Sequence, residues 1–350
     1  MTAVVVSGMM VHLNGLHLLF AMMATVSVLS AAEPSSSAVD VRSNLSEWQA
    51  GVRQIAIEGA ADGESQAALF YEPGGDVPHP LVVFLHPWSG NYLYKTGIGM
   101  VEGCQKKGWA FIQPDFHGPN HRPQALGSEL ALADIANAVS YARAHGNIDS
   151  RRIYLVGASG GGHAAMLAVG RLPGLFRAVS AWVPITDLIA WHAQCAGTSH
   201  VQYARDIEAA CGGVPIPGSA AEQEAIRRSP LTHLGQAGPI DVDLNTGIHD
   251  GHGNNSVPIS HTLQAYNLLA GPGDRISADE IRHIVKDEAI PEDLRFAGSD
   301  PSYGLRKVLL RKSSNHVRVT VTDGYHEILV PAALTWLMGI DQAMMEKESR

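Results

Sequence analysis

Charged residues and cysteines are both scarce in this chain of 350 residues. Only 17 % of the side chains are Asp, Glu, Lys or Arg, and the formal net charge is −9 with neutral histidines. This acidic balance excludes the basic surface that a nucleic-acid-binding protein needs. Of the three cysteines, Cys195 and Cys211 lie in one local segment and could pair, whereas Cys104 fits a small buried residue in a helix.

Charge is wholly absent from the first 32 residues, and Glu33 is the first charged side chain. The apolar run 18–29 resembles the core of a secretory signal, and Ser30-Ala31-Ala32 is a credible cleavage site. We therefore expect residues 1–32 to be a signal peptide, with cleavage near Ala32 and export to the periplasm or the exterior.

The same segment lacks two other features. It has no Lys or Arg for the usual positive start of a signal, which leaves an uncleaved membrane anchor open. It also lacks a long unbroken hydrophobic run, because His12, Asn14 and His17 interrupt it. A spanning helix is therefore less favoured than a signal. Otherwise we expect no membrane partner.

What the chain does contain is a large apolar fraction, 45 %, in an alternating pattern of strands and helices. The Ser-, Ala- and Pro-rich residues from 33 to about 46 form the expected linker, and 47–350 a single catalytic domain. Continuous apolar runs are typical of parallel strands buried on both faces. An α/β fold follows, with a mostly parallel central sheet, helices on both faces and insertions at about 187–237 and 272–305. The expected strands are 55–57, 67–71, 81–85, 109–112, 153–156, 178–183, 240–246, 307–311 and 317–321.

The expected helices are amphipathic or follow capping residues. Ser128 precedes apolar residues spaced by three and four, and Ser277 begins a capping box with Glu280. Further helices are expected at 163–169, 260–269 and 331–345.

One serine lies in a pattern that favours catalysis. Gly157-Ala158-Ser159-Gly160-Gly161 follows the strand 153–156 and precedes a helix. This is the context of the G-x-S-x-G nucleophile turn, in which small residues let the strand and the helix approach closely. The alternative is a purely structural glycine-rich turn.

A serine hydroxyl needs a base, and the base needs an orienting carboxylate. His326 follows the strand 317–321 on a short loop and is the predicted base. Asp250, on the loop after the strand 240–246, is the predicted carboxylate. The alternatives are a surface-loop histidine and an aspartate that forms an Asx turn.

Further residues complete the predicted site. The backbone N–H groups of Gly160 and Trp88 are the expected oxyanion hole, since Pro87 has no N–H. Trp88 could also wall the pocket or pack in the core. His117 and Asn120 follow the next strand at the same edge of the sheet, so they are candidate substrate contacts or turn residues.

A metal site is the less favoured alternative. His249, Asp250 and His252 could supply ligands, but no second cluster in the sequence completes a site. We predict no metal and no organic cofactor.

With these residues in place, the chain resembles the catalytic domain of the prolyl oligopeptidase family of α/β-hydrolases. The most specific segments are 147–153, which lead into the serine turn, Arg228-Ser229-Pro230-Leu231, 247–250 with Val257-Pro258, and 324–327. The resemblance covers about residues 80–337. It implies an α/β-hydrolase fold, a Ser159–Asp250–His326 triad and no cofactor.

The chain also departs from the family pattern. Six residues separate Asp250 from Val257, more than usual. After the expected cleavage, roughly forty residues precede the sheet, too few for the family's propeller. The expected site is therefore more open, like that of related secreted acyl esterases acting on carbohydrate esters.

Three functions are compatible with these motifs and departures. The first is a secreted serine hydrolase of carboxylic esters, such as acylated carbohydrates, that forms an acyl-enzyme. The alternative is a serine peptidase of this family that acts on short peptides. A catalytically silent binding protein is the remote alternative. The expected partner is thus a small-molecule ester, an acylated saccharide or a short peptide.

Overall fold

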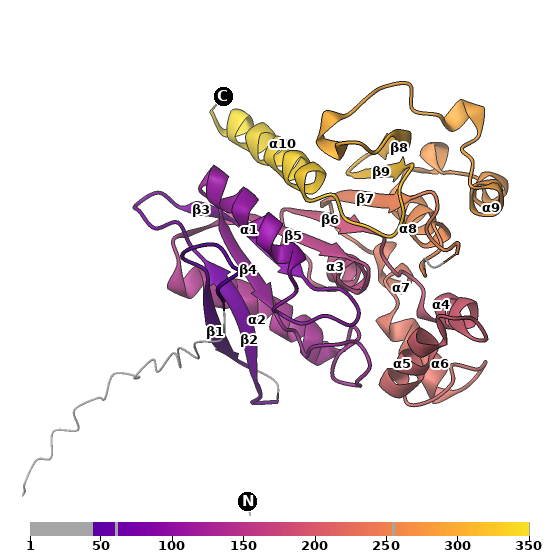
Figure 1. Cartoon of the computed structure of the whole chain (residues 1–350), viewed down its shortest axis with the longest axis horizontal. Helices are drawn as coiled ribbons and strands as arrows, with labels where there is room; N and C mark the ends of the chain where they lie inside the picture. Colours follow the sequence, from indigo (N-terminus) through magenta and orange to yellow (C-terminus); the bar gives the residue numbers. More distant parts are fainter. Residues whose placement is uncertain (1–44, 60–61, 254–255, 350) are drawn as a thin grey trace, which may run out of the picture. The chain divides into compact units, whose positions relative to one another are not determined.

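The computed structural model describes residues 45–59, 62–253 and 256–349. The expected signal peptide and most of the expected linker lie outside these residues. Within the described part, nine strands form one sheet in the order β1-β2-β4-β3-β5-β6-β7-β9-β8 (Figure 1). The strands are β1 (Arg53–Glu58), β2 (Ser65–Tyr71), β3 (His79–Leu85), β4 (Ala110–Pro114), β5 (Ile148–Ala158), β6 (Ala178–Trp182), β7 (Asp241–Gly247), β8 (Val308–Ser314) and β9 (Val317–Thr322).

The sheet is parallel in its centre and antiparallel at both edges. Strand β3 pairs in parallel with β4 and β5, and the parallel pairing continues through β6 and β7 to β9. The edge pairs β1–β2, β2–β4 and β8–β9 are antiparallel. The predicted α/β fold with a mostly parallel sheet is confirmed.

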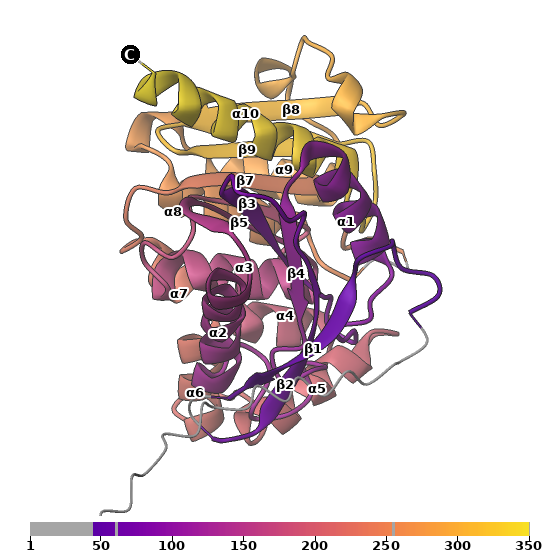
Figure 2. The same ribbon diagram turned by 90° about the vertical axis from the view of Figure 1, so that its left-hand side faces the viewer.

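Helices cover both faces of this sheet (Figures 1 and 2). The helices are α1 (Thr96–Lys107), α2 (Glu129–His145), α3 (Gly160–Arg171), α4 (Leu188–Cys195), α5 (Val201–Cys211), α6 (Ala220–Arg228), α7 (Leu231–Leu234), α8 (Ser260–Leu269), α9 (Ala278–Asp287) and α10 (Val330–Glu348). Short 3₁₀ helices lie at Pro272–Asp274, Glu292–Leu294 and Pro301–Tyr303.

The alternation of side chains along the central strands decides which helices meet which face. In β3, Leu81, Val83 and Leu85 face one side, where they join a core with residues of α2, α3 and α8. Val82 and Phe84 face the other side and pack with residues of α1 and α10. Every second side chain of a strand points to the same face, so an unbroken apolar run serves both cores.

Local signals explain several helix ends. The Ser128 side chain accepts a hydrogen bond from the N–H of Ala131, and Ser277 forms the predicted capping box with Glu280. Both caps satisfy backbone donors that a helix start leaves without intrahelical partners.

The connection between β6 and β7 contains the helices α4 to α7, and the first three share a small core of their own. This core includes Trp88, Trp191, Ile207 and both Cys195 and Cys211. All three cysteines are free and buried, so the pairing of Cys195 with Cys211 is not formed. None of the helices in the described part has the length and apolar character that a membrane span requires.

Candidate active site

Ser159 lies in the sharp turn between β5 and α3. Its backbone has φ 57° and ψ −119°, a conformation that residues with a side chain rarely adopt. A Cβ on Gly157 would collide with the carbonyl of Gly161, and one on Gly161 would collide with the carbonyl of Leu85. The motif therefore needs glycine at these two positions, because β5, β3 and the start of α3 approach one another too closely for any side chain.

Asp250 and His326 form a direct hydrogen bond. The Nδ1 atom of His326 lies 2.7 Å from Oδ2 of Asp250. The carboxylate is fully buried, whereas the imidazole is 23 % exposed. The other carboxylate oxygen, Oδ1, accepts hydrogen bonds from the N–H groups of Gly251 (2.9 Å) and Val257 (3.3 Å). This arrangement orients the imidazole and leaves its Nε2 atom for proton transfer.

Val257 also accounts for the long spacing after Asp250 in the sequence. Its backbone N–H donates to the carboxylate of Asp250, seven positions earlier in the chain. The loops that carry Asp250 and His326 meet at Gly247, where a Cβ would collide with the backbone of Gly324. Two backbone hydrogen bonds, from Ile248 N to Thr322 O (2.9 Å) and from His249 N to Gly324 O (3.2 Å), hold the two loops together.

The backbone N–H groups of Gly160 and Trp88 lie beside the serine turn. A Cβ on Gly160 would meet the N and Cα atoms of Trp88, which places these two backbone segments in contact. Neither N–H donates a hydrogen bond within the described residues. Two unengaged donors beside a serine are what an oxyanion hole requires.

Ser159 and His326 open into the same cavity of about 540 Å³. Its walls are mostly apolar and aromatic, with contributions from Trp88, Tyr94 and Tyr203. One acidic residue, Glu327, also lines it, and Arg306 lies 2.8 Å from the Glu327 carboxylate. The cavity therefore suits a ligand that carries an apolar or aromatic group.

His117, a candidate substrate contact or turn residue, does not line the Ser159 cavity. Its imidazole is buried and connects two carboxylates: Nδ1 contacts Asp134, and Nε2 lies 3.0 Å from Asp62. The backbone at His117 turns left-handed, with φ 70°, and this directs the side chain toward β1, β2 and α2 rather than into the Ser159 cavity. Burial raises the pKa of Asp134 to about 6.

Asn120 lies beside the backbone of Gly160 and Trp88 rather than on the cavity wall. Its backbone N–H donates to the carbonyl of Trp88 (2.9 Å), and its Oδ1 accepts from Leu126 N (2.9 Å). Its Nδ2 is buried without a hydrogen-bond partner and would lie 2.8 Å from a Cβ on Gly160. Substrate contact by Asn120 is still a proposal.

The residues of the alternative metal hypothesis are engaged in other contacts. Asp250 faces His326, and His249 Nδ1 lies 2.5 Å from Glu288. Elsewhere in the described part, potential ligand atoms of Asp62, Glu64 and His117 lie within 4.8 Å of one another. None of these three lines the Ser159 cavity.

Among the residues near the site that the sequence did not indicate, two lie on α5. Tyr203 lines the cavity from α5, and Asp206 on the same helix accepts a hydrogen bond from the Trp88 indole (2.9 Å). Trp88 and Asp206 are 118 residues apart and belong to no shared motif, so no local pattern could have paired them.

Comparison with known proteins agrees with this geometry. The prolyl oligopeptidase family model matches residues 101–278, half of the chain. No curated protein sequence matches the chain significantly.

Solved structures show a similar fold at low sequence identity. A puromycin hydrolase superposes with a TM-score of 0.58 at 15 % identity, over 84 % of this chain and 39 % of its own. A puromycin-hydrolyzing peptidase of Mycobacterium tuberculosis gives a TM-score of 0.54 at 17 % identity, over 83 % of this chain and 39 % of that one. Pyrococcus horikoshii acylaminoacyl peptidase gives a TM-score of 0.50 at 18 % identity, over 62 % and 34 %. This chain thus spans less than two fifths of the length of these proteins.

The family match and the α/β-hydrolase fold agree with the serine turn and its neighbours. The chain belongs to the prolyl oligopeptidase family.

Proposed function

We propose that this chain cleaves short peptides or aminoacyl amides through an acyl-Ser159 intermediate. The single observation that carries this proposal is the Asp250–His326 hydrogen bond of 2.7 Å, with His326 and Ser159 facing one cavity. Ser159 would be the nucleophile, His326 the base and Asp250 the orienting acid.

The proposed reaction has two stages. The Oγ atom of Ser159 attacks the substrate carbonyl carbon, its proton passes to Nε2 of His326, and the carbonyl electrons move to oxygen. The N–H groups of Gly160 and Trp88 stabilise that oxyanion until the C–N bond breaks and His326 protonates the leaving amine. Water activated by His326 then hydrolyses the acyl-enzyme.

An amide substrate is favoured over the acylated carbohydrate that the sequence first pointed to. The family is named for peptidase activity, and two of the similar structures are peptidases by name. The aromatic side chains of Trp88, Tyr94 and Tyr203 on the cavity wall also suit an apolar or aromatic amino-acid side chain. The same acyl-enzyme chemistry would hydrolyse an ester, so the preferred substrate distinguishes a peptidase from an esterase.

Covalent labelling tests the nucleophile. A fluorophosphonate should label wild-type protein at Ser159, with no labelling of Ser159→Ala. The absence of labelling on correctly folded wild-type protein would contradict the proposal. Activity that survives a chelator would argue against the metal-dependent alternative.

A substrate panel tests the class of substrate. Aminoacyl and short peptidyl arylamides should be turned over with a higher kcat/KM than acetylated sugars or p-nitrophenyl esters of matched acyl groups. Turnover confined to acetylated sugars would replace the peptidase assignment with an esterase.

We also propose export, on the strength of residues 1–32 alone. Expression of the full chain with a C-terminal tag should give a fractionated, exported product whose N-terminus begins near Glu33. An intact N-terminus on cytoplasmic protein would contradict export.

A further inference from the structure

The helices between β6 and β7 contact the side chain of Trp88, whose backbone N–H is one of the two proposed oxyanion donors. Its indole Nε1 donates a hydrogen bond to Oδ2 of Asp206 on α5 (2.9 Å). Trp88 as a whole is only 3 % exposed. Its indole ring packs edge-on against Trp191 of α4, with ring centroids 4.7 Å apart. Trp88 is therefore fixed by residues that follow it in the chain by more than a hundred positions.

Asp206 is an unusual residue to find at this position. Its side chain is 9 % exposed, and its second oxygen accepts a hydrogen bond from Gln202 Nε2 (2.8 Å). No Lys or Arg of the described residues forms an ion pair with it. A buried carboxylate without a cation depends on hydrogen bonds to replace its lost hydration. One of its two donors is the Trp88 indole, so the carboxylate has a use in holding that ring.

That use concerns the backbone of Trp88. Its carbonyl accepts a hydrogen bond from Asn120 N (2.9 Å), while its indole is held by Asp206. These two contacts act on opposite parts of the residue and leave its N–H in contact with Gly160. An oxyanion donor is effective only if it is already oriented when charge develops, because reorientation during the reaction would cost part of the stabilisation.

We propose that Asp206 is a positioning residue for the oxyanion hole. Through its hydrogen bond to the Trp88 indole, it holds the Trp88 N–H toward the developing oxyanion. The inserted helices thereby contribute to transition-state stabilisation as well as to the cavity wall. This role rests on the proposed function, since it requires that Ser159 attack a carbonyl.

Two substitutions at Asp206 separate the hydrogen bond from simple packing. Asp206→Asn keeps an oxygen acceptor for the indole, and Asp206→Leu keeps similar volume without an acceptor. We expect Asp206→Leu to lower kcat on an arylamide about 10- to 100-fold with KM changed less than about threefold. Asp206→Asn should stay within about threefold of wild type.

An oxyanion mimic gives a readout that a merely structural role would not move. A peptidyl trifluoromethyl ketone forms a bond from its carbonyl carbon to Ser159 Oγ and places an oxyanion in the hole. Its affinity should fall in Asp206→Leu by the same factor as kcat. Trp88→Phe, which removes the indole N–H, should cause a similar loss, and the double variant should lose no more than either single variant.

A control variant tests whether any weakening of the inserted helices has the same effect. Ser219 caps α6 by accepting a hydrogen bond from Glu222 N (3.0 Å), and among the described residues it forms no hydrogen bond with Trp88 or Asp206. Ser219→Ala should lower thermal stability but leave kcat and ketone affinity unchanged.

Three results would overturn the role of Asp206. They are wild-type kcat in Asp206→Leu, a loss that appears in KM alone, and an equal loss of kcat in Ser219→Ala. Failure of the proposed function differs from all three, because the wild-type protein itself would then resist fluorophosphonate labelling and turnover. That result would remove the oxyanion hole and the role of Asp206 with it.

Discussion

Ser159 has a left-handed backbone because the chain must reverse at the end of β5 and enter α3 at once. This conformation directs the hydroxyl out of the sheet, and the glycines on either side accommodate the close approach that results. Strain at this residue is balanced by the packing of β5 and α3 in the main core. The free-energy cost of the strained backbone is therefore confined to Ser159, whereas the packing that offsets it involves the whole sheet.

At this scale, Asp250→Asn should reduce kcat by about 10³- to 10⁴-fold with little change in KM. The amide is isosteric, but its NH₂ group cannot stabilise an imidazolium and favours the wrong tautomer of His326. Steady-state kinetics would measure the loss, and circular dichroism would check that the fold is kept. A loss below about tenfold would exclude Asp250 as the orienting acid.

Gly161→Ala tests the close approach itself. The added methyl would collide with the carbonyls of Leu85 and His86, so the free energy of unfolding should fall by about 1–3 kcal/mol. The matched control is Gly99→Ala in α1, where the nearest atom to the added Cβ lies at 4.0 Å. That variant should be neutral or slightly stabilising, because alanine favours helix. Equal urea midpoints for the two variants would contradict this account.

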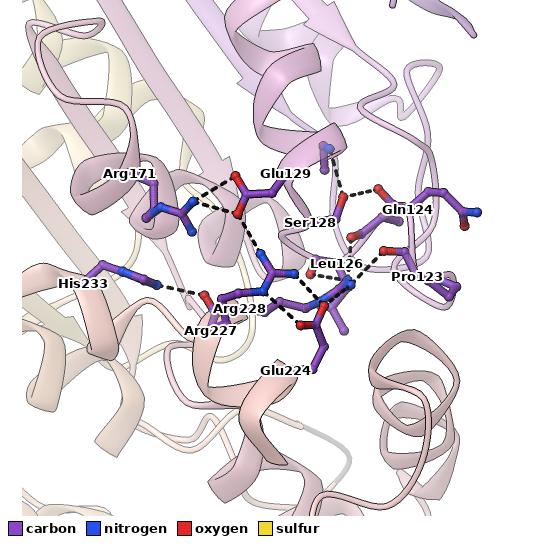
Figure 3. A network of polar contacts seen from close by, with 12 residues as sticks. Pro123, Gln124, Leu126, Ser128, Glu129, Arg171, Glu224, Arg227, Arg228 and His233 are labelled. Carbon is purple, nitrogen blue, oxygen red and sulfur yellow. Dashed lines mark hydrogen bonds and ion pairs between the residues drawn. The ribbon is translucent and has the colours of Figure 1, made fainter. Parts of the chain in front are cut away.

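At the scale of elements, α6 is tied to the loop before α2 by Arg228 (Figure 3). Its guanidinium donates to the carbonyls of Pro123, Ala125 and Leu126 at 2.9–3.2 Å and pairs with Glu224. Arg228 is 3 % exposed, and its hydrogen bonds to the carbonyls of Ala125 and Leu126 are buried. The Arg-Ser-Pro-Leu segment thus has a structural use, since one side chain satisfies the acceptors of an irregular loop.

Arg228→Met should therefore lower the free energy of unfolding by about 3–5 kcal/mol, because it leaves three carbonyls without their donor and removes a buried partner of Glu224. Its neighbour Arg227 provides the control. Arg227 pairs with Glu129 and Glu224 at the surface, with a side chain that is 36 % exposed. Arg227→Met should cost about 0–1 kcal/mol. Similar urea-unfolding curves for both variants would show that burial of Arg228 contributes little.

At the scale of the whole molecule, buried neutral histidines make stability depend on pH. Burial lowers the pKa of His163 and of His261 to about 4. The Nδ1 atom of His261 accepts a hydrogen bond from Thr186 N (3.1 Å), which requires an unprotonated nitrogen. Both imidazoles regain a pKa near 6.5 when the chain unfolds, so the unfolded state binds more protons below that pH.

The free energy of unfolding should therefore fall between pH 7 and pH 5, by about 2 kcal/mol for each of these histidines. His261→Asn keeps an acceptor near Thr186 N and removes one titrating group. Urea unfolding across this pH range should show a smaller loss in the variant than in wild type. An unchanged pH dependence would mean that His261 is protonated in the folded protein.

The sequence alone determined the order of the nine described strands along the chain and the residues of the candidate triad. Apolar runs, caps and the G-x-S-x-G turn are local, so residues a few positions apart were enough to predict β5, the turn and α3. Asp250 and His326 were predicted because each follows a parallel strand, and such strands bring their carboxyl ends to one edge. Their catalytic roles await the labelling and kinetic tests.

Only the tertiary structure decided which distant residues meet. His117 follows β4 as predicted, but its backbone has a positive φ and its imidazole contacts Asp62 and Asp134. The pairing of Trp88 with Asp206, and of Arg228 with the carbonyls of residues 123–126, joins segments about a hundred residues apart. Such contacts depend on how helices pack against the sheet. Side-chain direction and packing are properties of the assembled core, which no local pattern contains.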